Sequence, residues 1–182
     1  MPLTIAIIGA GPLGRRLAWR AARAGFTVLL EDVLPSNLEH AREAMRREFS
    51  AETLTGEGGG GISFVSTIED AVRGADLAID CVPDELESKL EILWLLDRMA
   101  PPHTIFATPT TNLSIADLGA CTYRPDKCIA IAASPAELAD LAADSDPEIV
   151  LRAANAAAAD SIGLVENVCR RIGFTVRSER AD

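Results

Sequence analysis

Short apolar runs alternate with amphipathic stretches along most of this 182-residue chain. The runs are rich in Ile, Val, Leu and Ala and have the length of buried strands. Those predicted as strands cover residues 3–8, 26–30, 62–65, 75–81, 104–107 and 127–132. The stretches between them repeat apolar residues at helical spacing, most clearly at 13–24, 35–50 and 84–99. Strands that alternate with helices predict a parallel α/β sheet with helices on both faces.

The end of the chain continues this alternation with more alanine. Its pattern predicts a brief helix capped by Ser114, a helix-prone insertion at 135–143, a strand at 148–153, a helix at 154–171 and a last strand at 174–177. The run Gly58–Gly61 has no strand before it and no helix after it, so we interpret it as a flexible connector. The length fits a single domain over residues 1–182.

A glycine-rich turn joins the first predicted strand to the first helix. Gly9, Gly11 and Gly14 stand at its first, third and sixth places. The first glycine permits a tight turn, the second lets the backbone approach a pyrophosphate, and the third lets the helix lie close to the strand. The helix that begins around Pro12 and Leu13 offers N–H groups and a partial positive charge to phosphates. This context predicts a dinucleotide site in a doubly wound, Rossmann-type fold.

Asp32 follows the second predicted strand, 23 positions after Gly9, where such folds carry a carboxylate that binds the adenine ribose. A carboxylate there repels a 2′-phosphate, and the next four residues include no Arg. We therefore expect NAD rather than NADP as the cofactor.

Composition and charge narrow the classes of function. The net charge of −10 argues against nucleic acid and anionic membrane surfaces as partners. No apolar run is long enough to span a membrane, and the chain enters its first strand without a leader pattern, so we expect a cytoplasmic protein. The four cysteines and two histidines have no metal-ligand spacing, so we expect reduced thiols and no metal site.

The loops at the carboxyl ends of the strands, where ligands of such sheets bind, resemble those of a known family. After the glycine turn come the segments EDV, CVPDELESK, APPHTIFATPTTNLSI and RPDKCIAI, in an order similar to the N-terminal NAD-binding domain of the 3-hydroxyacyl-CoA dehydrogenases. The resemblance is close over residues 1–132. It resumes loosely at RRIGFTV within a divergent stretch, 133–182, which has an inserted segment at about 135–147. It implies NAD as cofactor, an acyl-CoA-type small molecule as substrate, and hydride transfer between them.

The resemblance also implies roles for matching residues. Thr111 stands where the family has a Ser that hydrogen-bonds the substrate oxygen beside the nicotinamide, although Pro109 replaces an Asn of that motif. Asp84 and Lys89 match a family Glu and Lys along the path of NAD or substrate. The alternatives are that Asp84 only caps its helix and that Lys89 is a solvated surface charge. The other implied cofactor contacts are Gly9, Gly11, Pro12, Leu13, Gly14, Asp32, Val82, Pro83 and Thr108.

The pattern departs from the family where its chemistry is done. The family's catalytic His belongs directly after RPDKCIAI, where this chain has Ala132-Ala133-Ser134-Pro135. The Glu that orients this His belongs on the following strand, at Val150 or Leu151, whereas a gapless count places Asp144 there. An imidazole suits the removal of an alcohol proton because its pKa lies near neutrality, and alanine has no titratable group. We therefore expect the usual alcohol oxidation to be weak or altered.

No other residue is an evident substitute base. His103 precedes its strand and so belongs at the amino end of the sheet, and we expect His40 on a helix surface. Glu137, Asp140 and Asp144 fit a solvated helix face. The family continues into a helical C-terminal domain that closes over the acyl-CoA and usually forms the dimer, and this chain ends where that domain would begin. We expect a homodimer through another surface, or a partner subunit that supplies the lid or the base.

Three functions fit these observations. The first is an NAD-binding oxidoreductase of this family with altered or supplemented chemistry. The second is a non-catalytic NAD(H)-binding sensor or regulatory subunit. The third, a structural module that has lost its cofactor, fits least, because Gly9, Gly11, Gly14 and Asp32 together have little purpose without a nucleotide.

Overall fold

A computed structural model describes residues 3–48, 60–142 and 145–181 of the chain. Within these residues the strands form one eight-stranded sheet in the order β3-β2-β1-β4-β5-β6-β7-β8. The strands are β1 (Thr4–Ile8), β2 (Thr27–Glu31), β3 (Gly61–Val65), β4 (Leu77–Asp80), β5 (Ile105–Pro109), β6 (Cys128–Ala132), β7 (Glu148–Ala154) and β8 (Thr175–Ala181). The helices are α1 (Pro12–Arg23), α2 (Pro35–Glu48), α4 (Ile68–Val72), α5 (Leu86–Met99), α6 (Ile115–Ala120), α7 (Pro135–Ala139) and α8 (Ala159–Arg171).

Strands β1 to β6 are parallel to one another, β7 is antiparallel to β6, and β8 is parallel to β7. The order of the strands reverses direction between β1 and β4, which is the point where doubly wound sheets bind nucleotides. The prediction of a mostly parallel, doubly wound α/β sheet is confirmed.

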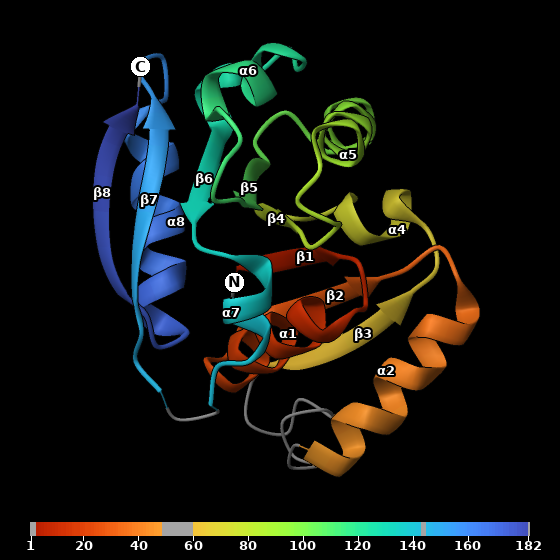
Figure 1. Ribbon diagram of the computed structural model, residues 1–182. Coiled ribbons are helices and arrows are strands. Elements are labelled where there is room, and N and C mark those ends of the chain that lie inside the picture. Colours follow the sequence, from red (N-terminus) through yellow and green to blue (C-terminus); the bar gives the residue numbers. More distant parts are fainter. Residues whose placement is uncertain (1–2, 49–59, 143–144, 182) are drawn as a thin grey trace.

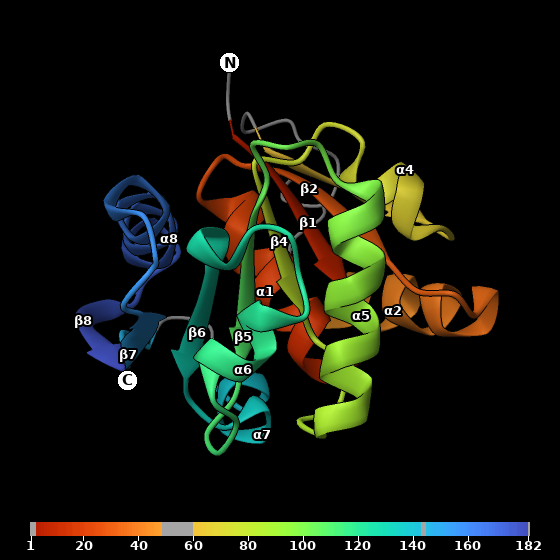
Figure 2. The ribbon, with the colours of Figure 1, turned by 90° about the horizontal axis from the view of Figure 1, so that it is seen from above.

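Helices cover both faces of the sheet (Figure 1). The alternation of side chains along a strand explains this, because Ile5 and Ile7 of β1 enter one apolar core while Ala6 and Ile8 enter the other. The first core takes residues from α1, α2 and α8, and the second takes residues from α4, α5 and α6. Figure 2 shows β1, β4, β5 and β6 side by side with α5 packed over this second face.

The C-terminal elements differ from their predicted bounds. The alanine-rich stretch predicted as one helix from Ala154 is a helix only from Ala159, since Ala154 ends β7 and pairs with Ala181 of β8. The backbone pairing of β7 with β8 therefore outweighs the helix propensity of alanine. The last strand is longer than predicted, and the insertion after β6 holds a helix of five residues.

The predicted glycine connector lies partly outside the described residues, which begin again at Gly60. Gly61 opens β3, and a Cβ on Gly60 would lie 2.4 Å from the Ala22 carbonyl oxygen. The end of the run is therefore fixed closely against α1, and the prediction of a flexible connector is wrong for Gly60 and Gly61.

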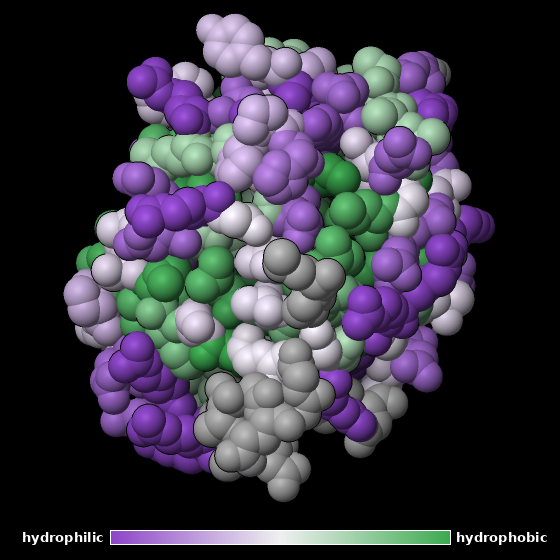
Figure 3. Space-filling view, turned by 180° about the vertical axis from the view of Figure 1, so that it is seen from behind, coloured by the Kyte–Doolittle hydropathy of each residue, from purple (hydrophilic) through white to green (hydrophobic). Residues whose placement is uncertain are grey.

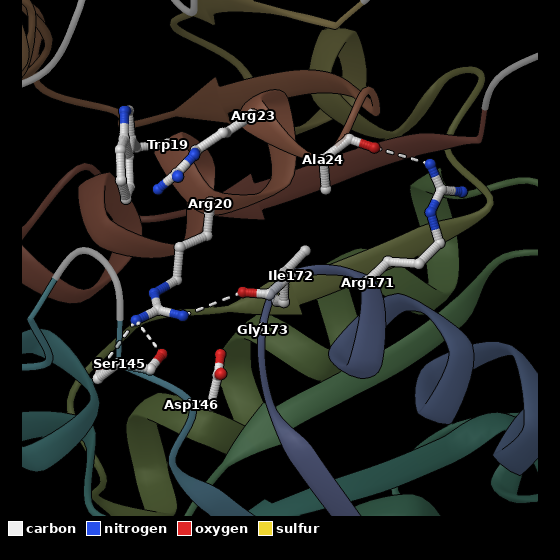
Figure 4. A pocket seen from close by; sticks show the side chains of 9 residues that line it. All are labelled: Trp19, Arg20, Arg23, Ala24, Ser145, Asp146, Arg171, Ile172 and Gly173. Atoms are coloured by element: carbon white, nitrogen blue, oxygen red, sulfur yellow. Dashed lines mark hydrogen bonds between the residues drawn. The ribbon is translucent and has the colours of Figure 1, made fainter.

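Arg20 of α1 holds this helix to the segment before β7 and to the turn after α8. Its Nη1 donates to the Ile172 carbonyl at 3.0 Å, and its Nη2 donates to the Ala142 carbonyl at 2.7 Å and to the Ser145 carbonyl and hydroxyl at 3.0 Å each. Figure 4 shows this side chain pointing to Ser145 and Ile172 beside a cavity of about 280 Å³. Arg20 is only 4% exposed, so these hydrogen bonds are buried.

The other arginines of this cavity are also engaged with the protein. Arg171 donates to the Ala24 carbonyl at 2.7 Å, and its guanidinium lies 3.9 Å from the centre of the Phe26 ring. Arg23 lies over the Trp19 ring at 5.2 Å. We therefore interpret the cavity as part of the packing interface between α1 and the turn that follows α8, and not as a ligand site.

Within the described ranges, no helix combines the length and the apolar character that a membrane crossing requires. On the face seen from behind, hydrophobic areas are interrupted by hydrophilic residues (Figure 3).

All four cysteines are free thiols, and Cys128 and Cys169 are buried.

Candidate dinucleotide site

Each glycine of the β1–α1 turn occupies a different environment. Gly9 has a φ of +104°, a conformation that L side chains rarely adopt. A Cβ on Gly14 would lie 1.9 Å from the Gly9 carbonyl oxygen, so this position brings α1 against the turn. A Cβ on Gly11 would meet nothing within 4 Å. The space over Gly11 is open, which fits the close approach of a diphosphate to bare main chain.

Helix α1 begins at Pro12, and its N-cap, Gly11, has no side chain to bond the free N–H groups. The first turn also has no acidic residue. Proline suits this position because its missing N–H is unpaired in a helix start anyway. Leu13 is buried beneath the turn. The uncapped N-terminus therefore keeps its donors and its partial positive charge for a phosphate.

Asp32 stands directly after β2, beside the glycine turn. Its Oδ2 accepts a hydrogen bond from the Ala10 N–H at 3.1 Å, and its Oδ1 accepts from the Leu34 N–H and from Asn37 Nδ2 at 3.0 Å each. The carboxylate therefore holds the turn in place as well as offering its remaining lone pairs to a ribose, which the sequence did not reveal.

A cleft of about 420 Å³ opens next to Asp32, between the carboxyl ends of β1 and β2 and helices α4 and α5. Its lining is mostly apolar, and its charged residues are the acids Glu31, Asp32 and Glu91. The lining residues are Ile8, Gly9, Glu31, Asp32, Val33, Ile68, Val82, Pro83, Ser88, Glu91, Ile92 and Leu95. An apolar cleft beside a ribose-binding carboxylate suits an adenine ring.

The loops after β4 and β5 are tied together by Asp84. Its Oδ2 accepts a hydrogen bond from the Thr111 N–H at 3.2 Å, and the residue that caps α5 is Glu85. The alternative that Asp84 only caps this helix is therefore wrong. Among the described residues, the buried Oδ1 of Asp84 has no hydrogen-bond partner.

Lys89 is fully buried in α5, and its Nζ lies 2.5 Å from Oδ1 of Asp80, the last residue of β4. The alternative that Lys89 is a solvated surface charge is therefore wrong. Burial raises the pKa of Asp80, while the Lys89 ammonium and the Thr108 hydroxyl oppose that rise. Thr108, in β5, is itself buried. An ion pair at this depth sets the position of the β4–α5 loop that carries Asp84.

Two buried carboxyls, Asp80 and Glu31, were not predicted from the sequence. Each ends an apolar strand, and a charged residue directly after such a run was the available signal. The hydrogen-bonded partner of Asp80 lies nine positions away, on the next helix, and no local pattern indicates it.

Two strands that pair side by side carry the positions at which the family resemblance implies a catalytic His and Glu. Ala132 of β6 is the register partner of Val150 of β7, and Ile131 is the partner of Leu151. None of these side chains titrates. Asp144, the alternative from a gapless count, lies outside the described residues.

The other candidate bases lie on the surface or at the far end of the sheet. His40 is exposed on α2, and His103, which precedes β5, is exposed near Asp76 at 3.9 Å. Glu137 and Asp140 are exposed on and just after α7. Both histidines lie where the sequence placed them.

A second hollow, of about 300 Å³, adjoins the loop after β5. Hydroxyl and amide side chains predominate in it, together with one cation. Its lining residues are Thr110, Thr111, Asn112, Leu113, Ser114, Ile115, Ala130 and Arg152. Thr111, predicted to bond a substrate oxygen, therefore borders a polar hollow close to Asp84.

The fold, the bare glycine turn and the cleft beside Asp32 define an NAD-binding, Rossmann-type domain of an oxidoreductase class. The family model of the NAD-binding domain of 3-hydroxyacyl-CoA dehydrogenase matches residues 4–150. The chain belongs to this family, and NAD is its cofactor.

Curated relatives are similar over the same part of the chain. A probable 3-hydroxybutyryl-CoA dehydrogenase of Bacillus subtilis is 33% identical over 133 residues, which are 69% of this chain and 46% of the relative. The mitochondrial hydroxyacyl-coenzyme A dehydrogenase of Sus scrofa is 32% identical over 144 residues, which cover 68% of this chain and 43% of that protein. This chain thus spans less than half the length of these relatives.

Solved structures share the fold over nearly the whole chain. A 3-hydroxyacyl-CoA dehydrogenase of Archaeoglobus fulgidus has a TM-score of 0.80 at 22% identity, over 99% of this chain and 57% of that one. The 5-formyl-3-hydroxy-2-methylpyridine 4-carboxylic acid 5-dehydrogenase, described as an NAD+-dependent dismutase, has a TM-score of 0.80 at 29% identity, over 99% of this chain and 58% of that one.

Proposed function

We propose that this chain is the NAD(H)-binding part of an oxidoreductase that transfers hydride between NAD and a 3-hydroxyacyl or 3-oxoacyl thioester, with weak or altered activity on its own. One observation carries the second half of this proposal. The β6–β7 pair at the redox end of the sheet presents Ala132 beside Val150, and neither side chain can accept a proton.

Bound NAD supplies the hydride acceptor. The residues of this chain would bind and orient it, with the N–H groups at the start of α1 facing the diphosphate and Asp32 facing the adenine ribose. Asp84 fixes the Thr111 backbone, which directs that residue toward the polar hollow after β5. The Thr111 hydroxyl could then donate to a substrate carbonyl oxygen. A threonine hydroxyl is no general base at neutral pH, so proton removal from an alcohol would need a group supplied from outside these residues.

Acetoacetyl-CoA and NADH provide the test, with NADH absorbance followed in the steady state. We expect turnover about 10²–10⁴-fold below that of an enzyme with an intact general base. The variant Ala132→His should not restore activity, because no carboxylate stands at Val150 to orient the new imidazole. Turnover at the full rate of the family, by the chain alone, would refute the proposal.

The pairing of Ala132 with Val150, neither of which can accept a proton, also supports a second candidate function, that of a non-catalytic NAD(H) sensor or regulatory subunit. In that case NADH binding would change the affinity for a partner while no 3-oxoacyl substrate is reduced, alone or with a partner present. A pull-down with and without NADH measures the change in partner affinity that a sensor predicts, and NADH absorbance with the partner added measures the gain in turnover that the oxidoreductase predicts.

A further inference from the structure

Glu31, the last residue of β2, lies inside the cleft predicted for the adenosine half of the nucleotide. Its register partners are Ile8 of β1 and Val65 of β3. Its neighbour Leu30 packs into the core on the α1 side, so Glu31 points to the opposite face, where it lines the cleft with Asp32. Glu31 is 4% exposed. A carboxyl group therefore lies at the bottom of a cleft that is otherwise mostly apolar.

A second carboxyl in the same layer of the sheet provides a comparison. Ile8 pairs with Glu31 on one side and with Asp80 on the other, so the two carboxyl groups share a face, with backbones about 10 Å apart. Asp80 has the Lys89 ammonium as its partner. Within the described residues, no hydrogen bond or ion pair reaches the Glu31 carboxyl. Of these two buried acids, one is neutralised by the protein and the other is left open to the cleft.

The titratable groups that line this cleft are all acidic. Besides Glu31 they are Asp32, after β2, and Glu91, on α5. The remaining elements contribute no charged lining residue: β1 and its turn present Ile8 and Gly9, α4 presents Ile68, the β4–α5 loop presents Val82 and Pro83, and α5 adds Ser88, Ile92 and Leu95. Among the lining residues there is no Lys or Arg that could stabilise an ionised Glu31.

Burial, and then the charge of Asp32, raise the pKa of Glu31 from 4.5 to about 7. At neutral pH the carboxyl is therefore divided between its neutral and ionised forms. A nucleotide in the cleft would remove the remaining water from Glu31 and bring phosphate charges nearer. Both effects disfavour the ionised form. A neutral carboxyl also offers one O–H donor and one carbonyl acceptor, which match the ring nitrogens and exocyclic amine of adenine.

We propose that Glu31 is a binding determinant for the adenosine half of NAD(H), and that the nucleotide binds the form of the domain in which this carboxyl is neutral, taking one proton from solvent where Glu31 was ionised. This inference rests on NAD(H) binding as the function of the cleft. Glu31 would make the affinity for the nucleotide depend on pH. Its neighbour Asp32 would make the site select NAD over NADP, because its carboxylate repels a 2′-phosphate.

Calorimetric titration of the whole chain with NADH, in buffers of different ionisation enthalpy, measures the proton uptake directly. At pH 7.5 we expect uptake of about 0.8 proton per NADH, and an affinity about 25-fold weaker at pH 8.5 than at pH 6.5. ADP-ribose, which lacks the nicotinamide, should show the same uptake because the effect belongs to the adenosine half. The wild-type measurement does not depend on any variant being folded.

Two variants assign the proton to its residue. Glu31→Gln keeps the shape of the side chain and should bind NADH with almost no proton uptake and with an affinity that is flat with pH to within about 2-fold. Glu87→Gln removes an exposed charge from α5 outside the lining of the cleft and should keep the wild-type uptake.

The outcomes separate this inference from the function on which it rests. NADH binding by the wild type without proton uptake would overturn the inference alone, and so would full uptake by Glu31→Gln. No NADH binding by the wild type at any pH would overturn the assignment of the cleft itself. Uptake that Glu31→Gln abolishes and Glu87→Gln retains would support the inference.

Discussion

At the scale of single residues, the three glycines of the β1–α1 turn are alike in sequence and different in consequence. A side chain at Gly14 would collide with the Gly9 carbonyl, whereas one at Gly11 would project into open space. The sequence predicted the roles of all three from their spacing. It could not show which of them the fold itself needs, because that depends on distances between α1 and the turn.

We predict that Gly14→Ala lowers the free energy of unfolding by several kcal/mol, on the order of an overpacked core site, because backbone must move to admit the Cβ. Gly11→Val should change that free energy by less than about 1 kcal/mol. Urea denaturation of both variants checks this. Equal losses in the two variants would show that the open space over Gly11 is not real.

Glu31 makes the stability of the domain depend on pH. Its pKa is about 7 in the folded chain and its ordinary value is 4.5, so the folded state holds the proton more tightly. The stability that this proton confers is complete below pH 4.5 and is lost as the pH rises to about 7. We predict that Glu31→Gln is more stable than the wild type by about 2–3 kcal/mol at pH 8, and equal to it near pH 4.5.

Thermal or urea denaturation at the two pH values measures this difference. Glu91→Gln, whose carboxylate is exposed, serves as the control and should show no such divergence between pH 4.5 and 8. A Glu31→Gln variant that tracks the wild type across this interval would rule out a shifted carboxyl at this position.

The Lys89–Asp80 pair is a residue-scale feature that the sequence concealed. We predict that Lys89→Met destabilises the chain by about 3–5 kcal/mol, because it leaves the Asp80 carboxylate buried without its cation. Lys127→Met, at the other lysine, removes an ammonium that bonds the Pro102 carbonyl near the surface and should cost less than about 1 kcal/mol. The double variant Asp80→Asn/Lys89→Met should recover part of the loss, and denaturation curves of all three test this.

At the scale of elements, the periodicity of apolar residues predicted the order and type of the strands and helices from β1 to β6. It did less well where alanine dominates. Alanine has the highest intrinsic helix propensity, but tertiary context overrides propensity, so pairing with β8 decided the border between β7 and α8. Sequence distance also hid the contacts of Arg20, whose acceptors lie more than 120 positions away.

Arg20 therefore carries an element-scale prediction. Arg20→Met should lower the free energy of unfolding by about 2–4 kcal/mol, because it leaves the Ala142, Ser145 and Ile172 carbonyls without their donor. Arg46→Met, on the exposed side of α2, is the matched control and should have little effect. Hydrogen exchange should show the loss most strongly in β7, α8 and β8. A uniform loss across the sheet would argue against a local joint.

At the scale of the whole molecule, the chain is an NAD-binding domain of its family in which the register partners Ala132 of β6 and Val150 of β7 carry no titratable group. The cofactor half was predictable because its physical demands, a bare turn and a ribose carboxylate, appear as residues at fixed spacing. The buried carboxyls and the hollow near Thr111 were not predictable, because they arise where separate strands and loops meet.

The central claim is that the chain binds NAD(H) against the exposed main chain at Gly11. Fluorescence titration with NADH tests it most directly, using the wild type and the folded variant Gly11→Val. The account predicts binding in the micromolar range by the wild type, and loss of binding by the variant of at least about 100-fold, since a side chain there occupies the space of the diphosphate. Equal affinities of the two proteins, or no wild-type binding below the millimolar range, would contradict it.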